Sequence, residues 1–466
     1  MEEKIHLSDV GFSYSNHFDT VLKGIDLEIE AGQCVLICGA SGSGKSTLTR
    51  FFNGLSPQYI EGDLQGDVSV FGLEPDRHPI EDFVPLAGSV FQNPKTQHFT
   101  TTARHELAFP LENSGVEPEK IKETVDQISQ YFQIEHLLDQ TLFNLSGGQK
   151  QQLAFAAATV LAPDLMVLDE VTSNLDQRST ARLQEMVADL KAQGVTLVLT
   201  EHRLAWLRDV VDRVILLEDG EIQQDWSGED FRSLSNEDLH RFNLRSMDLS
   251  PYEKKLDAKG QRKEVSQDAG LQTENLVIGH DKNFPLLTGL NLSFFQGTVT
   301  GIMGDNGRGK TSLAETLMGL LKPLDGAVYW QGEKAKSRQL TRQSFLVMQD
   351  TNYQLFSDSV ESEVSLGSQA EEDQDDVLAR LGLLDLKDRH PMSLSGGEKQ
   401  RVAIASALLS DKEVIIFDEP TSGLDYRNMQ IFGDLLRDLK DMNKIIIVIT
   451  HDVELAAEWC DTIIQV

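Results

Sequence analysis

The sequence predicts an α/β protein made of two homologous domains, each built on a mostly parallel β-sheet. The chain has 466 residues, which is enough for two to four domains of ordinary size. The same short motifs occur twice along it in the same order. Between them, short apolar runs alternate with helical patterns, which is typical of a parallel sheet buried on both faces.

Four motifs define the repeat. A glycine-rich segment, residues 39–46, recurs as residues 304–311, a shift of 265 positions. Three later motifs recur with a shift of 249 positions, and these are residues 145–149 with 394–398, residues 168–170 with 417–419, and His202 with His451. A period this long excludes a solenoid and indicates two copies of one domain.

We expect the first domain over residues 1–245 and the second over residues 271–466. Residues 246–270 are polar, of mixed charge and almost without apolar periodicity, so they are predicted to be a linker. Residues 369–376 are rich in acidic side chains and are predicted to begin a solvated surface helix. The first copy continues past Leu217 into a hairpin that ends in an edge strand, whereas Val466 is the counterpart of Leu217 in the second copy.

Composition excludes several classes of function. The chain has 42 Lys+Arg against 74 Asp+Glu, a formal net charge of -32, which argues against nucleic acid as the main partner. No run of about 18 apolar residues occurs, and the start lacks the layout of a signal peptide. A role at a membrane therefore requires a partner. Three cysteines are too few for a disulfide framework and fit a reducing compartment.

The polar motifs follow the carboxyl ends of predicted strands, where parallel sheets bind ligands. These strands are residues 34–38, 165–168, 195–199, 414–417 and 444–449. The glycine loops offer backbone N–H groups and a helix N-terminus to a triphosphate. Lys45 would bridge its β- and γ-phosphates and Ser46 would bind Mg²⁺, with Lys310 and Thr311 repeating these roles.

The remaining motifs suggest hydrolysis. Asp169 and Asp418 end buried strands, where a carboxylate needs a counter-charge such as Mg²⁺ held through water. The next residues, Glu170 and Glu419, suit the activation of an attacking water. The two repeated histidines follow the next strand and are placed to contact the γ-phosphate. The Ser-Gly-Gly segments 146–148 and 395–397 are either ordinary helix starts or anion sites.

Cys38 directly precedes the first glycine loop. The positive end of that loop would favour a thiolate and make the residue redox-sensitive. The alternative is a small buried apolar residue.

Together, the glycine loop, Gln92 or Gln349, the Leu-Ser-Gly-Gly signature, the Asp-Glu pair and the histidine resemble the ATP-binding-cassette ATPase family, twice and over nearly the whole chain. The resemblance implies an antiparallel β subdomain and a helical signature subdomain beside each sheet. It also implies a head-to-tail pairing in which each ATP lies between one glycine loop and the other copy's signature. The two glutamines would contact Mg²⁺ and a membrane partner, and residues 173–176 and 422–425 match the family's D-loop.

The expected site residues fall into three groups. Catalytic residues are Glu170, Glu419, His202 and His451. ATP-binding residues are Tyr14, Gly39, Ser41, Gly42, Gly44, Lys45, Ser46, Thr47, Ser146, Gly147, Gly148, Gly304, Asn306, Gly307, Gly309, Lys310, Thr311, Ser312, Ser395, Gly396 and Gly397. Mg²⁺ ligands are Ser46, Gln92, Asp169, Thr311, Gln349 and Asp418.

The two copies differ in places. Tyr14 fits the family's adenine-stacking aromatic, or simple core packing, and its counterpart is near His280. Other departures are Val171 against Pro420, Gln152 against Arg401, and Arg308 in the second glycine loop. None removes a catalytic group, so we expect two competent but unequal ATP sites.

After the loop glutamines, Gln97, Phe99 and Glu106 match Gln354, Phe356 and Glu363 at offsets of 5, 7 and 14. This pattern resembles the ATPases of energy-coupling-factor importers, which take up vitamins and transition-metal ions. The resemblance implies a groove on each copy for a helix of a transmembrane coupling component, beside a separate substrate-binding component. We expect Gln97, Phe99, Gln354 and Phe356 to line the grooves, and Glu106 and Glu363 to pair with arginines of the partner. One chain would serve each transporter, at the cytoplasmic face of the cell membrane.

Two other functions stay open. One is a tandem sugar-importer ATPase. The other is a soluble twin-cassette ATPase that acts on ribosomes, a group that usually carries a long, basic, helical linker. The linker predicted here is mixed in charge on a chain of net charge -32, which RNA would repel.

Overall fold

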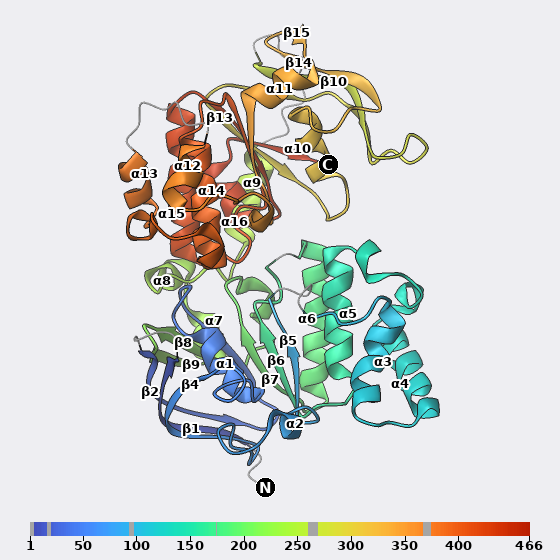
Figure 1. The fold of residues 1–466 in the computed structure, drawn as a ribbon, viewed down its shortest axis with the longest axis vertical. Helices are drawn as coiled ribbons and strands as arrows, with labels where there is room; N and C mark the ends of the chain where they lie inside the picture. Colours follow the sequence, from blue (N-terminus) through green and yellow to red (C-terminus); the bar gives the residue numbers. More distant parts are fainter. Residues whose placement is uncertain (1–3, 16–19, 93–96, 174, 260–268, 367–373) are drawn as a thin grey trace. The chain divides into compact units, whose positions relative to one another are not determined.

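The computed structural model describes residues 4–15, 20–92, 97–173, 175–259, 269–366 and 374–466. The chain divides into two compact units, Met1–Asp248 and Leu249–Val466 (Figure 1). Each unit contains a parallel sheet, an antiparallel sheet and packed helices, so the predicted α/β fold class is confirmed. Asn174 of the first D-loop, residues 260–268 of the predicted linker and residues 369–373 of the acidic stretch lie outside the described residues.

The parallel sheet of the first unit has the strand order β5-β6-β7-β3-β8-β9. Its strands are β3 (Cys34–Cys38), β5 (Ala87–Val90), β6 (Leu165–Asp169), β7 (Thr196–Thr200), β8 (Arg213–Glu218) and β9 (Glu221–Ser227). Neighbouring strands from β5 to β8 run parallel, and β9 pairs antiparallel with β8 at the edge. The predicted hairpin after Leu217 is therefore present.

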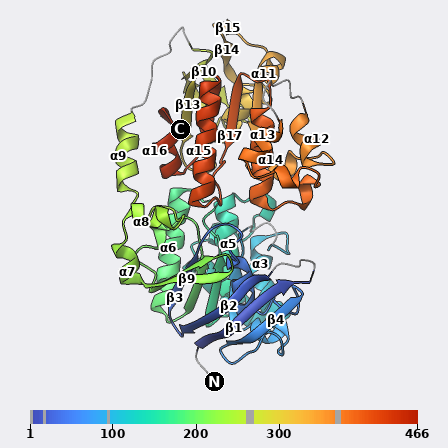
Figure 2. The same ribbon diagram turned by 90° about the vertical axis from the view of Figure 1, so that its left-hand side faces the viewer.

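An antiparallel sheet, ordered β2-β1-β4, stands beside this sheet and is seen most clearly in Figure 2. Its strands are β1 (Lys4–Tyr14), β2 (Thr20–Glu30) and β4 (Gly62–Val70). The helices of the unit are α1 (Lys45–Phe52), α2 (Ile80–Phe83), α3 (Ala103–Asn113), α4 (Pro118–Tyr131), α5 (Gly147–Thr159), α6 (Gln177–Ala192), α7 (Gly228–Ser233) and α8 (Asn236–Arg241). Short 3₁₀ turns are η2 (Glu135–Leu137), η3 (Leu142–Asn144) and η4 (Ala205–Leu207).

The second unit repeats the plan. Its parallel sheet has the order β16-β17-β18-β13-β19 and its antiparallel sheet the order β11-β10-β14-β15, with β12 on β10. The strands are β10 (Leu271–Ile278), β11 (Leu287–Leu290), β12 (Ser293–Phe294), β13 (Thr298–Met303), β14 (Asp325–Trp330), β15 (Glu333–Lys334), β16 (Ser344–Val347), β17 (Val414–Asp418), β18 (Ile445–Ile449) and β19 (Thr462–Gln465).

Helices of the second unit are α9 (Ser250–Lys259), α10 (Lys310–Leu317), α11 (Ser337–Gln343), α12 (Val360–Ser365), α13 (Gln374–Arg380), α14 (Gly396–Leu408), α15 (Tyr426–Asp441) and α16 (Val453–Trp459). Its 3₁₀ turns are η5 (Thr351–Tyr353), η6 (Leu384–Leu386) and η7 (Pro391–Ser393). Among the described residues, no helix is both long and apolar enough to cross a membrane.

Each parallel sheet separates two apolar cores, which explains its continuous apolar strands. In the first unit, Leu36 and Leu168 face a core formed with α3, α5 and α6, whereas Ile37 and Val167 face α1 and the antiparallel sheet. Every residue of β3, β7, β17 and β18 is buried. Burial at about 25 cal/mol per Å² of apolar surface makes these central strands the rigid base from which the polar loops extend.

The predicted linker contains a helix. Residues Ser250–Lys259 form α9, which packs on α16 although the segment lacks a clear apolar stripe. Tyr252 is buried, and Lys259 Nζ donates to the carbonyl oxygens of Ala456 and Ala457 at 3.2 and 2.6 Å. The last carbonyls of a helix lack most of their intrahelical donors, although Ala456 O also accepts from Cys460 N at 3.3 Å, so a lysine can add bonds to them. Polar capping thus orders a segment that hydrophobic periodicity does not reveal.

Candidate functional site

Each glycine loop connects a buried strand to a helix that begins at the loop lysine. Gly44 precedes α1 with φ 103° and Gly309 precedes α10 with φ 97°, a left-handed backbone that favours glycine. A Cβ at Gly39 would lie 2.0 Å from the carbonyl oxygen of Leu217, so no larger residue fits there. The loops are therefore folded in a form that only the observed glycines allow.

Both loop lysines are held in place by their own loops. Lys45 Nζ donates to the carbonyl oxygens of Gly39 and Ala40 at 3.1 and 2.9 Å, and Lys310 Nζ donates to those of Gly304 and Asp305 at 2.7 and 3.0 Å. Both ammonium groups thus lie against the backbone of their glycine loop, which is the segment that would also bind an added anion.

The hydroxyl that follows each lysine meets the strand-end aspartate. Ser46 Oγ donates to Asp169 Oδ1 at 3.1 Å, and Thr311 Oγ1 donates to Asp418 Oδ2 at 2.7 Å. Thr200 also donates to Asp169. These pairs bring together residues that are more than 100 positions apart in the chain.

Burial raises the pKa of both aspartates. The pKa of Asp169 is raised by burial, and the hydroxyl of Thr200 opposes this effect while Glu170 adds to it. The pKa of Asp418 is raised to about 6, again by burial, opposed by Thr311 and increased by Glu419. A buried carboxylate with this tendency to protonate is stabilised by any added cation.

Each glutamate faces its histidine. Glu170 Oε1 lies 3.1 Å from His202 Nε2, and Glu419 Oε2 lies 2.7 Å from His451 Nδ1. Both glutamates have a left-handed backbone, with φ 47° and 50°. Non-glycine residues in this conformation are strained and gather at functional sites, a signal that the sequence does not carry.

The loop glutamine of the first unit joins this group, because Gln92 Nε2 donates to Glu170 Oε2 at 2.8 Å. Gln349 is exposed at the equivalent place after β16. In each unit the structure thus gathers the lysine, hydroxyl, aspartate, glutamate and histidine at the carboxyl edge of the parallel sheet, as the sequence predicted. The roles assigned to them stay predictions.

Tyr14 is tied to the first glycine-loop helix. Its hydroxyl lies 2.6 Å from Thr47 Oγ1 and accepts from Arg50 Nη1 at 2.8 Å, while its ring meets Phe12 edge to face. In the second unit His280 Nε2 lies 3.4 Å from Ser312 Oγ, the matching contact. The predicted equivalence of Tyr14 and His280 therefore has a structural counterpart.

The Ser-Gly-Gly signatures belong to another part of each unit, at the starts of α5 and α14. Ser146 and Ser395 form capping boxes with Gln149 and Glu398. The serines and the first glycine after each, Gly147 and Gly396, are exposed, whereas Gly148 and Gly397 are half-buried. The two readings left open by the sequence, a helix start and an anion site, are compatible here.

The sequence missed a buried carboxylate beside each histidine. Glu201 Oε1 accepts from Thr172 N and Thr172 Oγ1 at 2.9 and 2.8 Å, and Asp452 Oδ2 accepts from Thr421 Oγ1 at 2.8 Å. The available signal was the contrast between Glu-His-Arg at 201–203 and Thr-His-Asp at 450–452. Burial raises the pKa of Glu201 to about 8, opposed by Thr172 and Arg203 and increased by Glu170.

This shift predicts a pH-dependent stability. Folded Glu201 retains its proton up to about pH 8, whereas the unfolded side chain loses it near 4.5. The folded state then binds more protons, so the stability from this group is complete below pH 4.5 and is lost as pH rises through about 8. Glu201→Gln should reduce the slope of the free energy of unfolding against pH by up to about 1.4 kcal/mol per pH unit. Unfolding midpoints of both proteins between pH 5 and 8 test it, and parallel curves would contradict it.

The loops after the glutamines bear on the expected grooves. The side chains of Gln97 and Gln354, expected to line them, are half-buried and bond their own loops: Gln97 Oε1 accepts from Phe91 N at 3.1 Å and Gln354 Oε1 accepts from Met348 N at 3.0 Å. Each side chain also donates to a strand carbonyl, at 2.5 and 2.7 Å. Both glutamines therefore shape the loop from within.

Glu106 and Glu363 are likewise turned inward and are not available to arginines of a partner. Glu106 accepts from the backbone N–H groups of Phe99 and Thr100, and Glu363 accepts from those of Phe356 and Ser357, at 2.7–3.2 Å. Only 5% of each glutamate is exposed. Burial raises the pKa of Glu106, but hydrogen bonds from His98 and Thr100 outweigh it, so the pKa ends below its usual value. We call this arrangement the glutamate brace.

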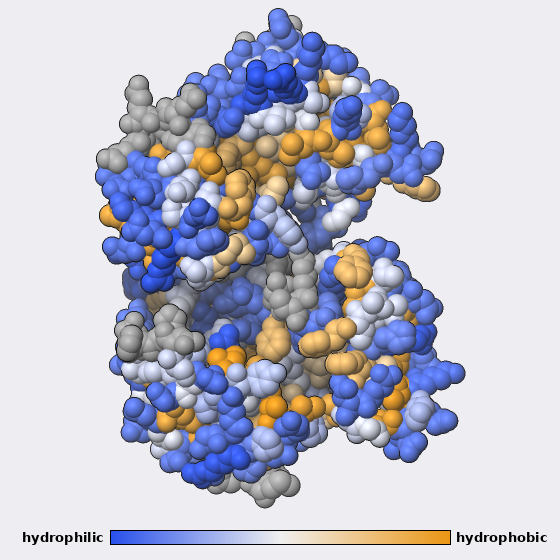
Figure 3. All heavy atoms as spheres, in the orientation of Figure 1, coloured by the Kyte–Doolittle hydropathy of each residue, from blue (hydrophilic) through white to orange (hydrophobic). Residues whose placement is uncertain are grey.

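Phe99 and Phe356 alone meet the expectation of exposure. Their side chains are 72% and 76% exposed, and Phe99 stacks on Phe109 with ring centroids 5.4 Å apart. The face drawn in Figure 3 is mostly hydrophilic, with groups of hydrophobic residues on both units. The two phenylalanines are candidate contact points for another molecule.

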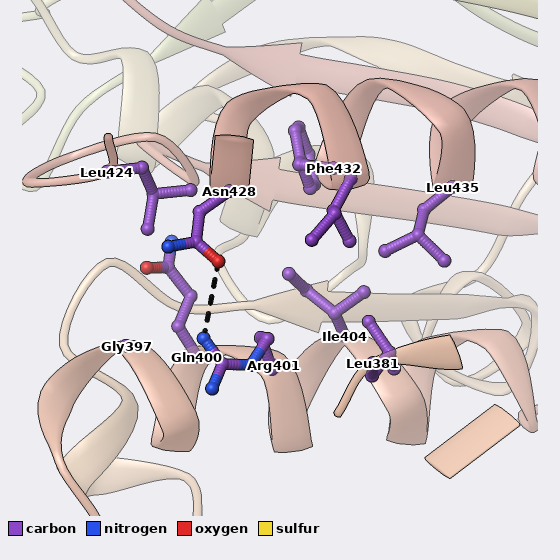
Figure 4. A pocket seen from close by; sticks show the side chains of 10 residues that line it. Leu381, Gly397, Gln400, Arg401, Ile404, Leu424, Asn428, Phe432 and Leu435 are labelled. Carbon is purple, nitrogen blue, oxygen red and sulfur yellow. Dashed lines mark hydrogen bonds between the residues drawn. The ribbon is translucent and has the colours of Figure 1, made fainter. Parts of the chain in front are cut away.

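A small pocket in the second unit marks a place where the copies differ (Figure 4). It is lined by Leu381, Gly397, Gln400, Arg401, Ile404, Leu424, Asn428, Ile431, Phe432 and Leu435. In the first unit, Gln152 and Arg182, 249 positions before Arg401 and Ile431, both donate to the carbonyl oxygen of Phe132, at 2.6 and 2.5 Å. Arg401 instead donates to Asn428 Oδ1 at 3.4 Å. The same helix junction is thus polar in one copy and largely apolar in the other.

Cys38 is fully buried, and burial raises the pKa of its thiol to about 12. A thiolate is therefore disfavoured, and the expectation of a redox-sensitive Cys38 is wrong. The nearby Lys45 lowers this pKa too little to offset burial.

Comparison with known proteins identifies relatives of the whole chain. The family model described as "ABC transporter" matches residues 22–173 and 287–422, once in each unit. A Treponema denticola protein, provisionally named an ABC transporter ATP-binding protein, is 40% identical over 99% of this chain and 94% of its own length. A Bacillus subtilis protein, provisionally named the HMP/thiamine import ATP-binding protein YkoD, is 29% identical over 99% of this chain and 90% of its own length.

Solved structures show the same fold. The RNase-L inhibitor has a TM-score of 0.65 at 21% identity, covering 100% of this chain and 88% of its own. An archaeal ribosome recycling factor, in complex with a ribosomal stalk protein, has a TM-score of 0.65 at 22% identity, covering 100% and 87%. At such identities the likeness concerns the fold.

Proposed function

This chain belongs to the ABC transporter family and carries two of its ATP-hydrolysing domains, the cassettes, one in each unit; from that premise we propose that it powers the uptake of a small solute through separate membrane subunits. The observation that carries the proposal is the pair Phe99 and Phe356. Each is exposed on a loop that its glutamate brace fixes from inside. A large apolar side chain held outward is suited to a docking helix.

The hydrolytic roles follow from the site geometry. Glu170 and Glu419 would accept a proton from the attacking water, because each is a carboxylate at the sheet edge beside a histidine. One oxygen of Glu419 is buried without a hydrogen-bond partner among the described residues, which leaves it able to accept one. Lys45 and Lys310 would neutralise phosphate charge, and the histidines would orient the γ-phosphate.

The same residues would hold Mg²⁺. The hydroxyl of Ser46 or Thr311 would bind the ion, and Asp169 or Asp418 would hold it through a bound water. The hydroxyl–carboxylate pairs at Ser46 and Thr311 have separations of 3.1 and 2.7 Å. Gln92 and Gln349 would complete the protein ligands, and the bound ion would neutralise phosphate charge. No cluster of three or more His, Cys, Asp or Glu side chains with metal-binding spacing occurs in the described ranges, so nucleotide oxygens and water would supply the rest.

The solute class we propose is a vitamin or a transition-metal ion, as in energy-coupling-factor importers. The loop pattern around Phe99 and Phe356 and the import role in the name of the Bacillus subtilis relative support it. The partners would be a transmembrane coupling component and a substrate-binding component. The chain would lie at the cytoplasmic face of the membrane, one copy per transporter.

Two alternatives make different predictions. A ribosome-acting ATPase would co-sediment with ribosomes in a salt-sensitive manner, which a net charge of -32 disfavours. A sugar importer would co-purify with membrane subunits that retain a sugar. We expect the chain to co-purify with integral membrane proteins that retain a vitamin or metal ion. Ribosome association without any membrane partner would overturn the proposal.

The docking role of the aromatic pair gives a sharper test. Phe99→Ala together with Phe356→Ala should abolish solute uptake, because both contact points lose their apolar side chain. ATP binding by the isolated chain should stay within about twofold, since surface substitutions away from the nucleotide change little. Uptake by cells and nucleotide titration measure the two effects.

Met442→Ala is the matched control, since it removes an apolar side chain that is 40% exposed at the end of α15. This control should transport normally. An intact membrane complex with normal uptake by the double phenylalanine variant would refute the docking assignment.

A further inference from the structure

The two cassettes place a buried carboxylate on opposite sides of the matched histidine. In the first cassette the carboxylate is Glu201, just before His202, and in the second it is Asp452, just after His451. Both nevertheless bond a threonine at matched positions. Thr172 and Thr421 donate their hydroxyls at 2.8 Å in each case. The same bridge is thus built from opposite neighbours of the histidine.

This bridge joins the two loops that carry the reacting groups. Thr172 lies two residues after Glu170, and Glu201 directly precedes the histidine that Glu170 faces at 3.1 Å. The glutamate loop also holds a left-handed backbone at φ 47°, which persists only where neighbouring contacts impose it. A buried hydrogen bond between the loops supplies such a contact, and both bridge partners are nearly fully buried, 0% and 2% exposed.

The exchange of the carboxylate across the histidine also changes the capping of the segment that follows the histidine. Asp452 also caps α16, accepting from Leu455 N at 3.2 Å. Arg203 occupies the equivalent position in the first cassette and cannot accept a cap bond, and only the 3₁₀ turn η4 follows it. Glu201 also accepts from Thr172 N at 2.9 Å, so it holds this loop through two hydrogen bonds.

We propose that Glu201 is a positioning residue for ATP hydrolysis in the first cassette, where it takes over the task that Asp452 performs in the second. It acts through Thr172, which fixes the direction in which Glu170 faces His202. The inference rests on the proposed roles of Glu170 and His202, but not on uptake or on any membrane partner.

Two substitutions of Glu201 distinguish the effect of its hydrogen-bond acceptor from the effect of its size. Glu201→Gln keeps the oxygen that both donors of Thr172 use, and its amide resembles the neutral acid that a pKa of about 8 implies. Glu201→Met keeps the length without an acceptor. We expect kcat to stay within about threefold in the first variant and to fall about tenfold or more in the second, with the KM for ATP nearly unchanged, since a buried unsatisfied donor is costly.

A double-mutant cycle with Thr172→Val tests the bridge itself. If the bridge positions Glu170, the effects of Thr172→Val and Glu201→Met on kcat are not additive, because either one removes the same contact. A further variant, Glu201→Thr with Arg203→Asp, transplants the second cassette's arrangement, and we expect it to recover part of the turnover lost by Glu201→Thr alone.

Turnover is measured on the purified chain, both in the natural background and with Glu419→Gln, where residual hydrolysis depends on Glu170. Thermal unfolding confirms that each variant is folded. Additive effects in the cycle, or equal losses in the glutamine and methionine variants with folding intact, would overturn the inference. Failure of uptake in cells with normal turnover would instead count against the proposed transport function.

Discussion

Replacing Glu170 and Glu419 together with glutamine should reduce ATP hydrolysis about a hundredfold or more while leaving ATP bound. Both glutamates lie at the sheet edge beside a histidine, in a strained backbone that the surrounding contacts impose. Glutamine keeps the size and loses the proton acceptor. The lysines and hydroxyls that would hold the triphosphate are untouched, so affinity should stay nearly constant.

Phosphate release and equilibrium nucleotide binding measure the two halves of this prediction. Each single variant shows how much turnover the other cassette sustains, which tests the expectation of unequal sites. Glu185→Gln, at an exposed position of α6, is the control and should behave as the natural chain. Turnover at the natural rate in the double variant would show that the glutamates have another role.

Replacing Lys45 and Lys310 together with alanine should instead cause a loss of ATP binding itself. Each ammonium group now donates to two carbonyl oxygens of its own loop, so it is already in place for a phosphate. A hydrogen bond to a charged group contributes about 1.5–3 kcal/mol, which corresponds to roughly 10–100-fold in affinity at each site.

Lys254→Ala, which removes an exposed lysine from α9, controls for the general loss of positive charge. Titration with a fluorescent ATP analogue at several salt concentrations measures affinity. If the lysine variants bound as tightly as the control, the assignment of the glycine loops to the triphosphate would be wrong.

The fold could be predicted from the sequence because its main signals are local and occur twice. Continuous apolar runs such as residues 165–168 identify buried strands, and the shared shift of 249 positions orders them in both copies. Helix α9 could not be predicted in this way. Its order comes from Lys259 and the carbonyls of a helix about 200 residues later, and no local pattern records such a contact.

In the candidate site, too, some features could be predicted from the sequence and others could not. Lys45, Ser46, Asp169, Glu170 and His202 follow strands of one parallel sheet, so their meeting at one edge is predictable from topology. The direction in which a side chain points cannot be predicted in this way. A glutamate in a loop pattern suggests a partner charge, whereas backbone N–H groups of the same loop, invisible in the sequence, are what each brace carboxylate binds.

The role of Glu201 could be predicted from the sequence only in part. The exchange of acidic residues around the histidines is legible in the sequence, but its meaning depends on which side chain each carboxylate reaches. Only the contact with Thr172 shows that the two arrangements are equivalent.

The glutamate brace also bears on how such a chain can diverge. Because Glu106 and Glu363 hold the loop through main-chain N–H groups, the loop's shape does not depend on the outward side chains. Those positions are therefore free to accumulate substitutions without loss of architecture. After duplication, each copy can acquire its own binding preference while inheriting one scaffold. Shape and selectivity are thus encoded by separate residues and can evolve at separate rates.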